Sequence, residues 1–143
     1  MKAFISTTFY GFFNHILALT LIASPWLFGF ANVSNAALLL PMYIGWLQLI
    51  MAIFTDNKAS FIRQLPMQTH LVIDVFMGFI LIIAPWLYNF SSKGVFLPHL
   101  LLGSLLVFLG IFTAKSPFLN KPHRPAPEGQ LGSTDSFEGR LNI

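Results

Sequence analysis

The sequence predicts an all-α protein, a bundle of four transmembrane helices built from two parallel, tandem two-helix repeats and followed by a flexible C-terminal tail. Composition is the first observation behind this prediction: 55% of the 143 residues are hydrophobic and 9% are charged, whereas about a quarter of a soluble domain is charged. The second is a series of four long apolar runs separated by short polar segments. The third is an aromatic motif that occurs twice, 60 residues apart.

The repeated motif reads Ser-Pro-Trp-Leu-Phe-Gly-Phe over residues 24–30 and Ala-Pro-Trp-Leu-Tyr-Asn-Phe over residues 84–90. An offset of 60 also pairs residues that precede the motif. An offset of 58 pairs Gly45 with Gly103, which follow the two copies of the motif. The earlier pairs are Tyr10 with His70, Asn14 with Asp74, and Ala18 with Gly78. Such self-similarity indicates one structural unit written twice. The expected divisions are a first membrane repeat over residues 1–60, a second over residues 61–114, and a tail over residues 115–143.

The first helix is expected over residues 8–28, which contain no charged residue. About 20 apolar residues are enough to cross a hydrocarbon core of about 30 Å. A secretory signal peptide is the alternative, because Lys2 precedes this apolar run. The pattern recurs over residues 70–90, where no signal peptide can lie, and the run is long for a signal sequence. Both facts favour a helix that the protein keeps.

Three further helices are expected over residues 36–54, 69–87 and 95–113. Gly103 and Gly110 are seven residues apart and so share one helix face, where another backbone can approach closely. Gly78 is expected to serve helix packing in a similar way, opposite Ala18 between the first and third helices.

Each copy of the motif places a proline near the carboxyl end of its helix, at Pro25 and Pro85. A proline ring removes a backbone donor, which frees the carbonyl four residues earlier, that of Leu21 in the first copy. The Ser24 hydroxyl can bond backbone freed in this way, whereas Ala84 has no such group. We therefore interpret the motif as a helix stop.

Aromatic and basic residues predict the orientation of the helices. Trp26 and Trp86 are interpreted as anchors at the membrane boundary, where an indole is favoured. Lys93 is the only basic residue on the side of the membrane where Trp26 and Trp86 are expected. The other side carries Lys2, Lys58, Arg63, Lys115, Lys121 and Arg124. Because basic residues mark the cytoplasmic side, both termini are expected in the cytoplasm, with the protein in the cell inner membrane.

Other features of the chain exclude several classes of function. From residue 115 onward the sequence is rich in proline, glycine, serine and charge, which is typical of a flexible tail. The basic residues form no stripe on a periodic element, so nucleic acid is not an expected partner. The chain has no cysteine, which excludes disulfides, thiolate nucleophiles and cysteine metal sites.

Polar side chains inside the expected membrane spans are the candidates for function, because such residues are costly in lipid. Six of them can converge in one cluster near the cytoplasmic side: Tyr10, Asn14, His15, Gln48, His70 and Asp74. His70 and Asp74 are four residues apart and share a helix face. His15 lies about 100° around the helix from Asn14, which turns it away from the same interface. His99, near the outer start of the fourth helix, is expected at the membrane interface or in solvent.

Three uses of these residues are open. In the leading interpretation they hydrogen-bond helices together, and Asp74 bonds Asn14, Tyr10 or His70 across a seam between the two repeats. The second is passage of protons or small solutes, and the third is a metal or catalytic centre with His15 as a further ligand. The sequence shows no Ser-His-Asp spacing, phosphate loop, haem-binding histidine pair or dinucleotide motif. We therefore expect no catalytic residue, no metal and no cofactor.

The tripeptides Ser24-Pro25-Trp26 and Ala84-Pro85-Trp86 make the chain resemble the SPW-repeat family of small bacterial and archaeal integral membrane proteins. The resemblance covers Tyr10 to Thr113 and implies a two-repeat, four-helix membrane protein, but no particular activity. We expect a non-enzymatic scaffold or accessory subunit that contacts the lipid bilayer and assembles as a homo-oligomer or in a larger membrane complex. The alternative is a small permease or proton-conducting protein that uses Asp74 and His70.

Overall fold

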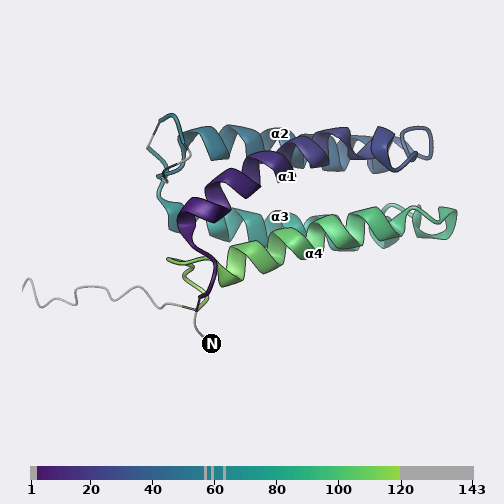
Figure 1. Ribbon diagram of the computed structural model, residues 1–143. Coiled ribbons are helices and arrows are strands. Elements are labelled where there is room, and N and C mark those ends of the chain that lie inside the picture. The colour runs from purple at the N-terminus through teal and green to yellow at the C-terminus, as the bar shows by residue number, and fades with distance from the viewer. Residues whose placement is uncertain (1–2, 57, 59, 63, 120–143) are drawn as a thin grey trace, which may run out of the picture.

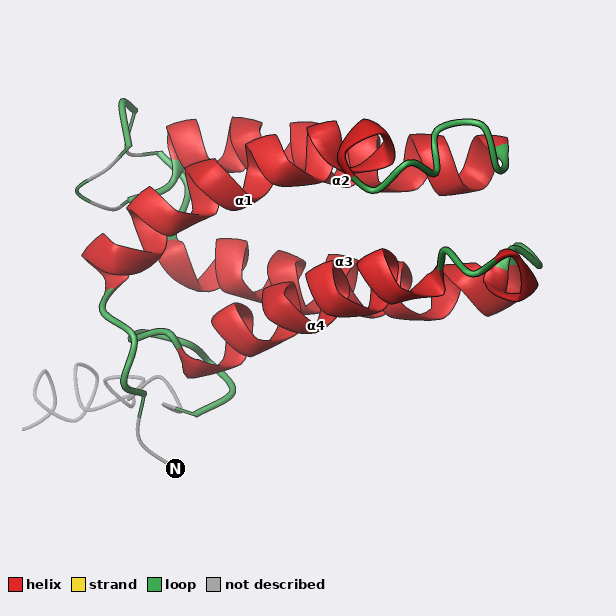
Figure 2. Ribbon diagram, turned by 45° about the vertical axis from the view of Figure 1, so that its right-hand side comes forward, coloured by secondary structure: helices red, strands yellow, loops and turns green. Residues whose placement is uncertain are grey.

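The computed structural model describes residues 3–56, 58, 60–62 and 64–119, and this part of the chain is all-α (Figures 1 and 2). Its helices are α1 (Thr7–Leu27), α2 (Asn35–Phe54), α3 (Met67–Leu87), the short 3-10 helix η1 (Ser91–Lys93) and α4 (Phe96–Phe112). The ends of the four long helices lie within two residues of those expected from the sequence. Most of the expected tail, residues 120–143, lies outside the described residues.

The first two helices begin at serines that cap them. The Ser6 oxygen accepts a hydrogen bond from the Phe9 amide at 3.1 Å, and the Ser34 oxygen accepts one from the Ala37 amide at 3.1 Å. A serine in this position satisfies an amide that otherwise has no partner in the first turn. In α3 the preceding residue is Pro66, which provides no side-chain cap.

The loops that follow α1 and α3 have the same backbone geometry. Each passes through a left-handed residue, Gly29 with φ of 70° and Asn89 with φ of 55°, and these two residue types tolerate that conformation. The next amide then turns back onto the proline carbonyl of its own motif, at 2.8 Å in the first loop and 2.9 Å in the second. The motif thus ends the helix and folds the following phenylalanine inward.

Small residues let the helices pack as two pairs, α1 with α2 and α3 with α4. A Cβ atom added to Gly45 would lie 2.8 Å from the Ala18 carbonyl oxygen, and one added to Gly103 would lie 2.7 Å from the Gly78 carbonyl oxygen. A Cβ atom at Gly110 would lie 2.7 Å from a carbonyl oxygen of α3. Such distances leave no room for a side chain, so the helix backbones are in contact.

These contacts confirm that Gly103 and Gly110 share a face on which another backbone approaches. The expected partnership of Ala18 and Gly78 between α1 and α3 is wrong, because Ala18 faces Gly45 of α2 and Gly78 faces Gly103 of α4. The physical reason is that a short loop already brings each helix beside the next one. Ala18 and Gly78 therefore make close backbone contacts inside their own helix pairs and not between the pairs.

The two pairs lie side by side with α1 and α3 running in the same direction (Figure 1). The motif loops share one end of the molecule, and the start of α1, the loop between α2 and α3 and the end of α4 share the other (Figures 1 and 2). At this second end, short parallel bridges join Thr55 to Leu65 and Ile5 to Thr113. The end of α2 is thereby tied to the start of α3, and the end of α4 to the start of α1.

The outward faces of the helices are strongly apolar. Among the described helices, α2 and α3 are long and apolar enough to cross a membrane, and α4 is apolar but shorter. Large side chains such as Phe12 and Phe76, each 63% exposed, cover the outer surface. Exposed apolar area on this scale marks a surface that contacts another apolar phase or partner.

Candidate functional site

Six polar side chains are completely buried between the two helix pairs, at the end where α1 and α3 begin. We call them the polar cluster: Tyr10 and Asn14 of α1, Gln48 of α2, Thr55 directly after α2, and His70 and Asp74 of α3. Five of these are residues that the sequence singled out, and the structure brings them together. Thr55 is an addition, and His15 lies apart.

Asp74 is the acceptor at the centre of the cluster. Its Oδ2 accepts a hydrogen bond from the Tyr10 hydroxyl, and its Oδ1 accepts one from Gln48 Nε2 at 2.7 Å. The carboxyl group therefore links three helices, because its donors come from α1 and α2. Tyr10 is confirmed as a partner of Asp74, whereas the bond described for Asn14 goes to His70 instead.

The His70 ring connects the rest of the cluster. The Thr55 hydroxyl donates to the Met51 carbonyl at 2.5 Å, and a hydroxyl has only one proton to donate. The Thr55 oxygen must therefore accept from His70, whose Nδ1 lies 2.5 Å away. This bond places a proton on Nδ1.

The second ring nitrogen of His70 has two kinds of neighbour. Asn14 Nδ2, a donor, lies 3.2 Å from Nε2, while Gln48 Oε1 lies at 3.2 Å and Asp74 Oδ1 at 3.4 Å. A neutral ring with its proton on Nδ1 accepts from Asn14, and a doubly protonated ring can donate to Gln48 or Asp74. The geometry therefore accommodates Nε2 with or without a proton.

Two buried polar atoms have no hydrogen-bond partner among the described residues: Oδ1 of Asn14, which belongs to the cluster, and Nε2 of His15, which does not. His15 Nδ1 bonds the Gly11 carbonyl at 2.7 Å and must donate to it. An unsatisfied buried polar group costs about 1–3 kcal/mol. This position is therefore the least well satisfied part of the site.

The cluster supplies one histidine and one carboxylate as strong metal ligands. Across the residues that the structure describes, no group of three or more His, Cys, Asp or Glu side chains is arranged to hold a metal ion. The side chains of the cluster donate and accept hydrogen bonds among themselves, and His70 and Asp74 are groups that can exchange protons.

At the other end of α1, Ser24 is buried and its hydroxyl donates to the Leu21 carbonyl at 2.8 Å. This bond confirms the expectation that the serine satisfies the carbonyl freed by Pro25. Trp26 and Trp86 are 61% and 54% exposed, and Ala84 is buried. The tryptophans therefore point outward, and their role as membrane-boundary anchors stays a prediction.

The SPW repeat domain model matches residues 8–113, which include all four long helices, both copies of the motif and the polar cluster. The chain belongs to the SPW repeat domain family. No curated protein and no solved structure matches this SPW repeat protein. Its family and its apolar helices together indicate a membrane protein.

In this SPW repeat protein both motif loops close over His99. The ring is 1% exposed, and its centroid lies 4.8 Å from that of Phe30 and 4.9 Å from that of Phe90. Its nitrogens face the carbonyls of Val95, at 3.0 Å, and of Ala37, at 3.3 Å. The expectation of an interfacial or solvated His99 is wrong, because phenylalanines folded inward from both loops exclude it from the surface.

Sequence reasoning missed Thr55 as a member of the polar cluster. The signal was present, since Ile-Phe-Thr ends both α2, at residues 53–55, and α4, at residues 111–113. Both threonines donate back to the helix, Thr55 to Met51 and Thr113 to the Leu109 carbonyl at 2.6 Å. Only the first of them has a histidine placed to use its oxygen.

Proposed function

We propose that this SPW repeat protein is a non-enzymatic scaffold or accessory subunit of the cell inner membrane. In this proposal all four long helices cross the bilayer as two tandem, parallel repeats, and both termini face the cytoplasm. The main support for this proposal is that the polar cluster is buried and that its side chains hydrogen-bond mostly to one another. A network of that kind joins helices and specifies one arrangement of them.

The cluster leaves little opportunity for a substrate. Neither the groove between α1 and α4 nor the hollow beside Trp86 is lined by a cluster residue. A carboxylate at the centre of a membrane helix costs about 2.5–3.5 kcal/mol on insertion scales. Donors from Tyr10 and Gln48 offset that cost, which supports a structural role for Asp74.

Equivalent contacts in the two pairs support the tandem repeat. Gly45 meets Ala18 as Gly103 meets Gly78, and the bridge of Thr55 with Leu65 has its counterpart in that of Thr113 with Ile5. These counterparts follow the offsets of 58 and 60 seen in the sequence. A two-fold axis along the membrane normal relates pairs that run in the same direction.

Cysteine accessibility tests the proposed topology, because the native chain contains no cysteine. Single variants Asp56→Cys and Ser92→Cys place an exposed thiol at opposite ends of the molecule. In intact cells a membrane-impermeant maleimide should label the Ser92 variant, and the Asp56 variant should react only after lysis. Labelling of both thiols in intact cells would contradict the topology.

Native mass spectrometry in mild detergent tests the scaffold role. The apolar outer faces predict a homo-oligomer or a complex with other membrane proteins. A defined mass above that of the 16.0 kDa chain is the expected result. A particle that is monomeric and without partners at every detergent concentration would refute the scaffold role while leaving the topology intact.

A proton-conducting protein is the second candidate, and the surroundings of His70 Nε2 favour it. This nitrogen lies between the Asn14 donor and two acceptors, so it has a hydrogen-bond partner whether or not it carries a proton. Vesicles containing the protein and a pH-sensitive dye test the idea. Flux that Asp74→Asn abolishes would support conduction, and flux equal to that of empty vesicles would remove this candidate.

A further inference from the structure

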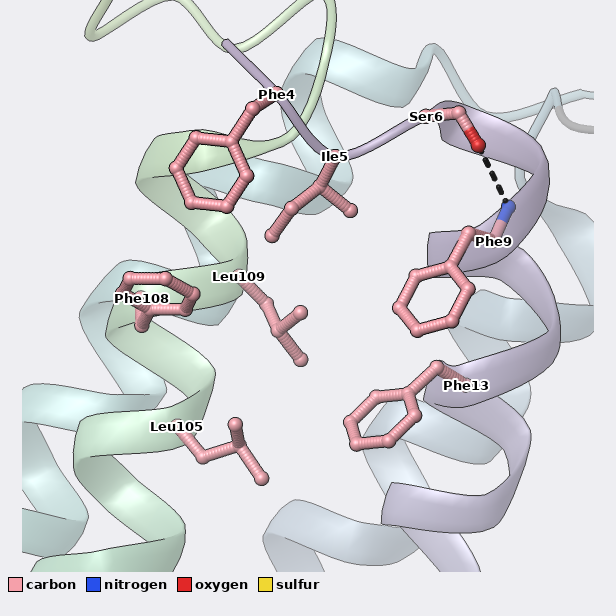
Figure 3. Close-up of a pocket in the computed structure, with 8 residues that line it drawn as sticks. All are labelled: Phe4, Ile5, Ser6, Phe9, Phe13, Leu105, Phe108 and Leu109. Atoms are coloured by element: carbon pink, nitrogen blue, oxygen red, sulfur yellow. Dashed lines mark hydrogen bonds between the residues drawn. The ribbon is translucent and has the colours of Figure 1, made fainter.

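The two interfaces between the helix pairs differ in closeness. Both interfaces are sparser than the contacts inside a helix pair, and α1 and α4 make fewer contacts with each other than α2 and α3 do. A cavity of about 480 Å³ opens between α1 and α4. We call it the α1–α4 groove, and its lining is Phe4, Ile5, Ser6, Phe9, Phe13, Leu105, Phe108 and Leu109 (Figure 3).

The polar cluster explains why α2 and α3 make more contacts than α1 and α4 do. Gln48 and Thr55 hydrogen-bond Asp74 and His70, and these bonds hold α2 against α3. On the α1–α4 side the facing positions carry large apolar residues instead. Figure 3 shows Phe9 and Phe13 of α1 opposite Leu105 and Leu109 of α4 across an open space.

The lining of the groove selects a hydrocarbon ligand. Ser6 is the one polar side chain, and its oxygen already accepts the Phe9 amide at 3.1 Å. The walls are stiffened by aromatic contacts, with Phe4 5.8 Å from Phe108 and 5.4 Å from Phe112 between ring centroids. A volume of this size lies within the range of small-molecule sites, about 300–1,000 Å³.

A basic residue, Lys115, follows the backbone segment that is hydrogen-bonded to the lining of the groove. The Ala114 amide donates to the carbonyl of Ile5, a lining residue, at 2.8 Å. The next residue is Lys115, whose side chain is exposed and whose backbone is held at a φ of 70°. A cation beside an apolar groove complements an anionic headgroup that carries a hydrocarbon chain.

We propose that the α1–α4 groove binds one anionic phospholipid, with an acyl chain between α1 and α4 and the phosphate at Lys115. This inference rests on the proposed placement of the chain in a membrane. Hydrogen bonds join α2 and Thr55 to α3, and the lipid fills the interface between α1 and α4, so it completes the contact between the two helix pairs. Removal of the lipid should loosen α1 from α4 and leave α2 on α3.

Native mass spectrometry with added lipid tests the proposal, with the full chain in mild detergent and equal amounts of phosphatidylglycerol and phosphatidylcholine. One phosphatidylglycerol should stay bound per chain, at least fivefold in excess over phosphatidylcholine. Leu105→Trp fills the groove and should reduce lipid binding at least fivefold. The matched control Leu101→Trp, at a position 59% exposed and outside the lining, should bind as the native chain does. Lys115→Gln should keep binding but lose the preference for phosphatidylglycerol.

Several outcomes would overturn the lipid proposal. Equal lipid binding by the Leu105→Trp and Leu101→Trp variants would do so, provided that both keep the native circular dichroism spectrum. A change of oligomeric state in Leu105→Trp without loss of lipid would assign the groove to a second copy of the chain. If lipid binds only to a chain that ends at residue 119, residues 120–143 compete with the lipid, and the groove would be assigned to that segment. Cysteine labelling at positions 56 and 92 tests the membrane placement separately. If the labelling shows the proposed orientation but no lipid binds, the groove site is refuted and the membrane placement is not.

Discussion

Contacts within the helix pairs and contacts between them use different chemistry. Within a pair, glycines bring two backbones together, as at Gly78 and Gly103, and the contact is apolar. Between the pairs, polar side chains meet at one end and His99 is enclosed by phenylalanines at the other. In a bilayer, where lipid is as apolar as leucine, close backbone packing stabilises each pair. Hydrogen bonds with few alternative partners then determine how one pair sits on the other.

The largest loss of stability is expected from a substitution that disrupts the contact between the two helices of one pair. Gly103→Leu would place its Cβ atom about 2.7 Å from the Gly78 carbonyl oxygen, so α3 and α4 must separate. Overpacking costs about 1–3 kcal/mol and occasionally more; because this clash is with backbone, we expect a cost of about 3 kcal/mol and little folded protein in detergent. Thermal unfolding followed by circular dichroism measures the effect. Ser104→Leu, at the exposed neighbouring position, is the control and should unfold as the native chain does.

A break between the pairs at the polar end should have an intermediate effect. Asp74→Leu removes the acceptor of Tyr10 and Gln48 and leaves both donors buried without it, which we expect to cost about 2 kcal/mol. Asp74→Asn keeps an acceptor and should cost less than about 1 kcal/mol. Unfolding in a denaturing detergent titration measures both variants. If the asparagine variant is as unstable as the leucine variant, the carboxylate charge itself stabilises the contact and the neutral hydrogen-bond account is wrong.

A break between the pairs at the aromatic end should have a smaller effect. His99→Leu keeps an apolar side chain between Phe30 and Phe90 but loses the hydrogen bond that the ring can donate to the Val95 or the Ala37 carbonyl. We expect a loss of about 1 kcal/mol, typical of one net hydrogen bond. The same detergent titration measures it. A loss larger than that of Asp74→Leu would show that the aromatic end, and not the polar cluster, dominates the contact between the pairs.

The smallest effect is expected inside a single helix. Ser24→Ala removes the bond to the Leu21 carbonyl and should cost about 0.5 kcal/mol, because the second copy already has Ala84 at this position. Ala84→Ser is the reciprocal variant and should change stability by no more than this amount. Amide hydrogen exchange near the end of α1 is the sensitive measurement. A fall in stability comparable to that of His99→Leu would mean that the serine contributes to packing as well as to its helix.

Local chemistry made much of the fold predictable from the sequence. The helix ends were found to within two residues, because prolines and polar segments act over a few residues along the chain. The bond from Ser24 to Leu21 was predictable for the same reason, since both residues lie in one helical turn. Membership in the SPW repeat domain family also follows from the sequence, through a motif written twice.

Distances between helices could not be obtained in this way. The sequence identified Tyr10 as a candidate partner of Asp74, but only the structure decided that Asn14 turns to His70 and that Thr55 completes the cluster. It also decided that Ala18 and Gly78 pack within their own pairs and that His99 is buried. Spacing along a chain determines which side chains share a helix face. The rotation and separation of neighbouring helices, which decide what that face meets, depend on all the side chains packed between them.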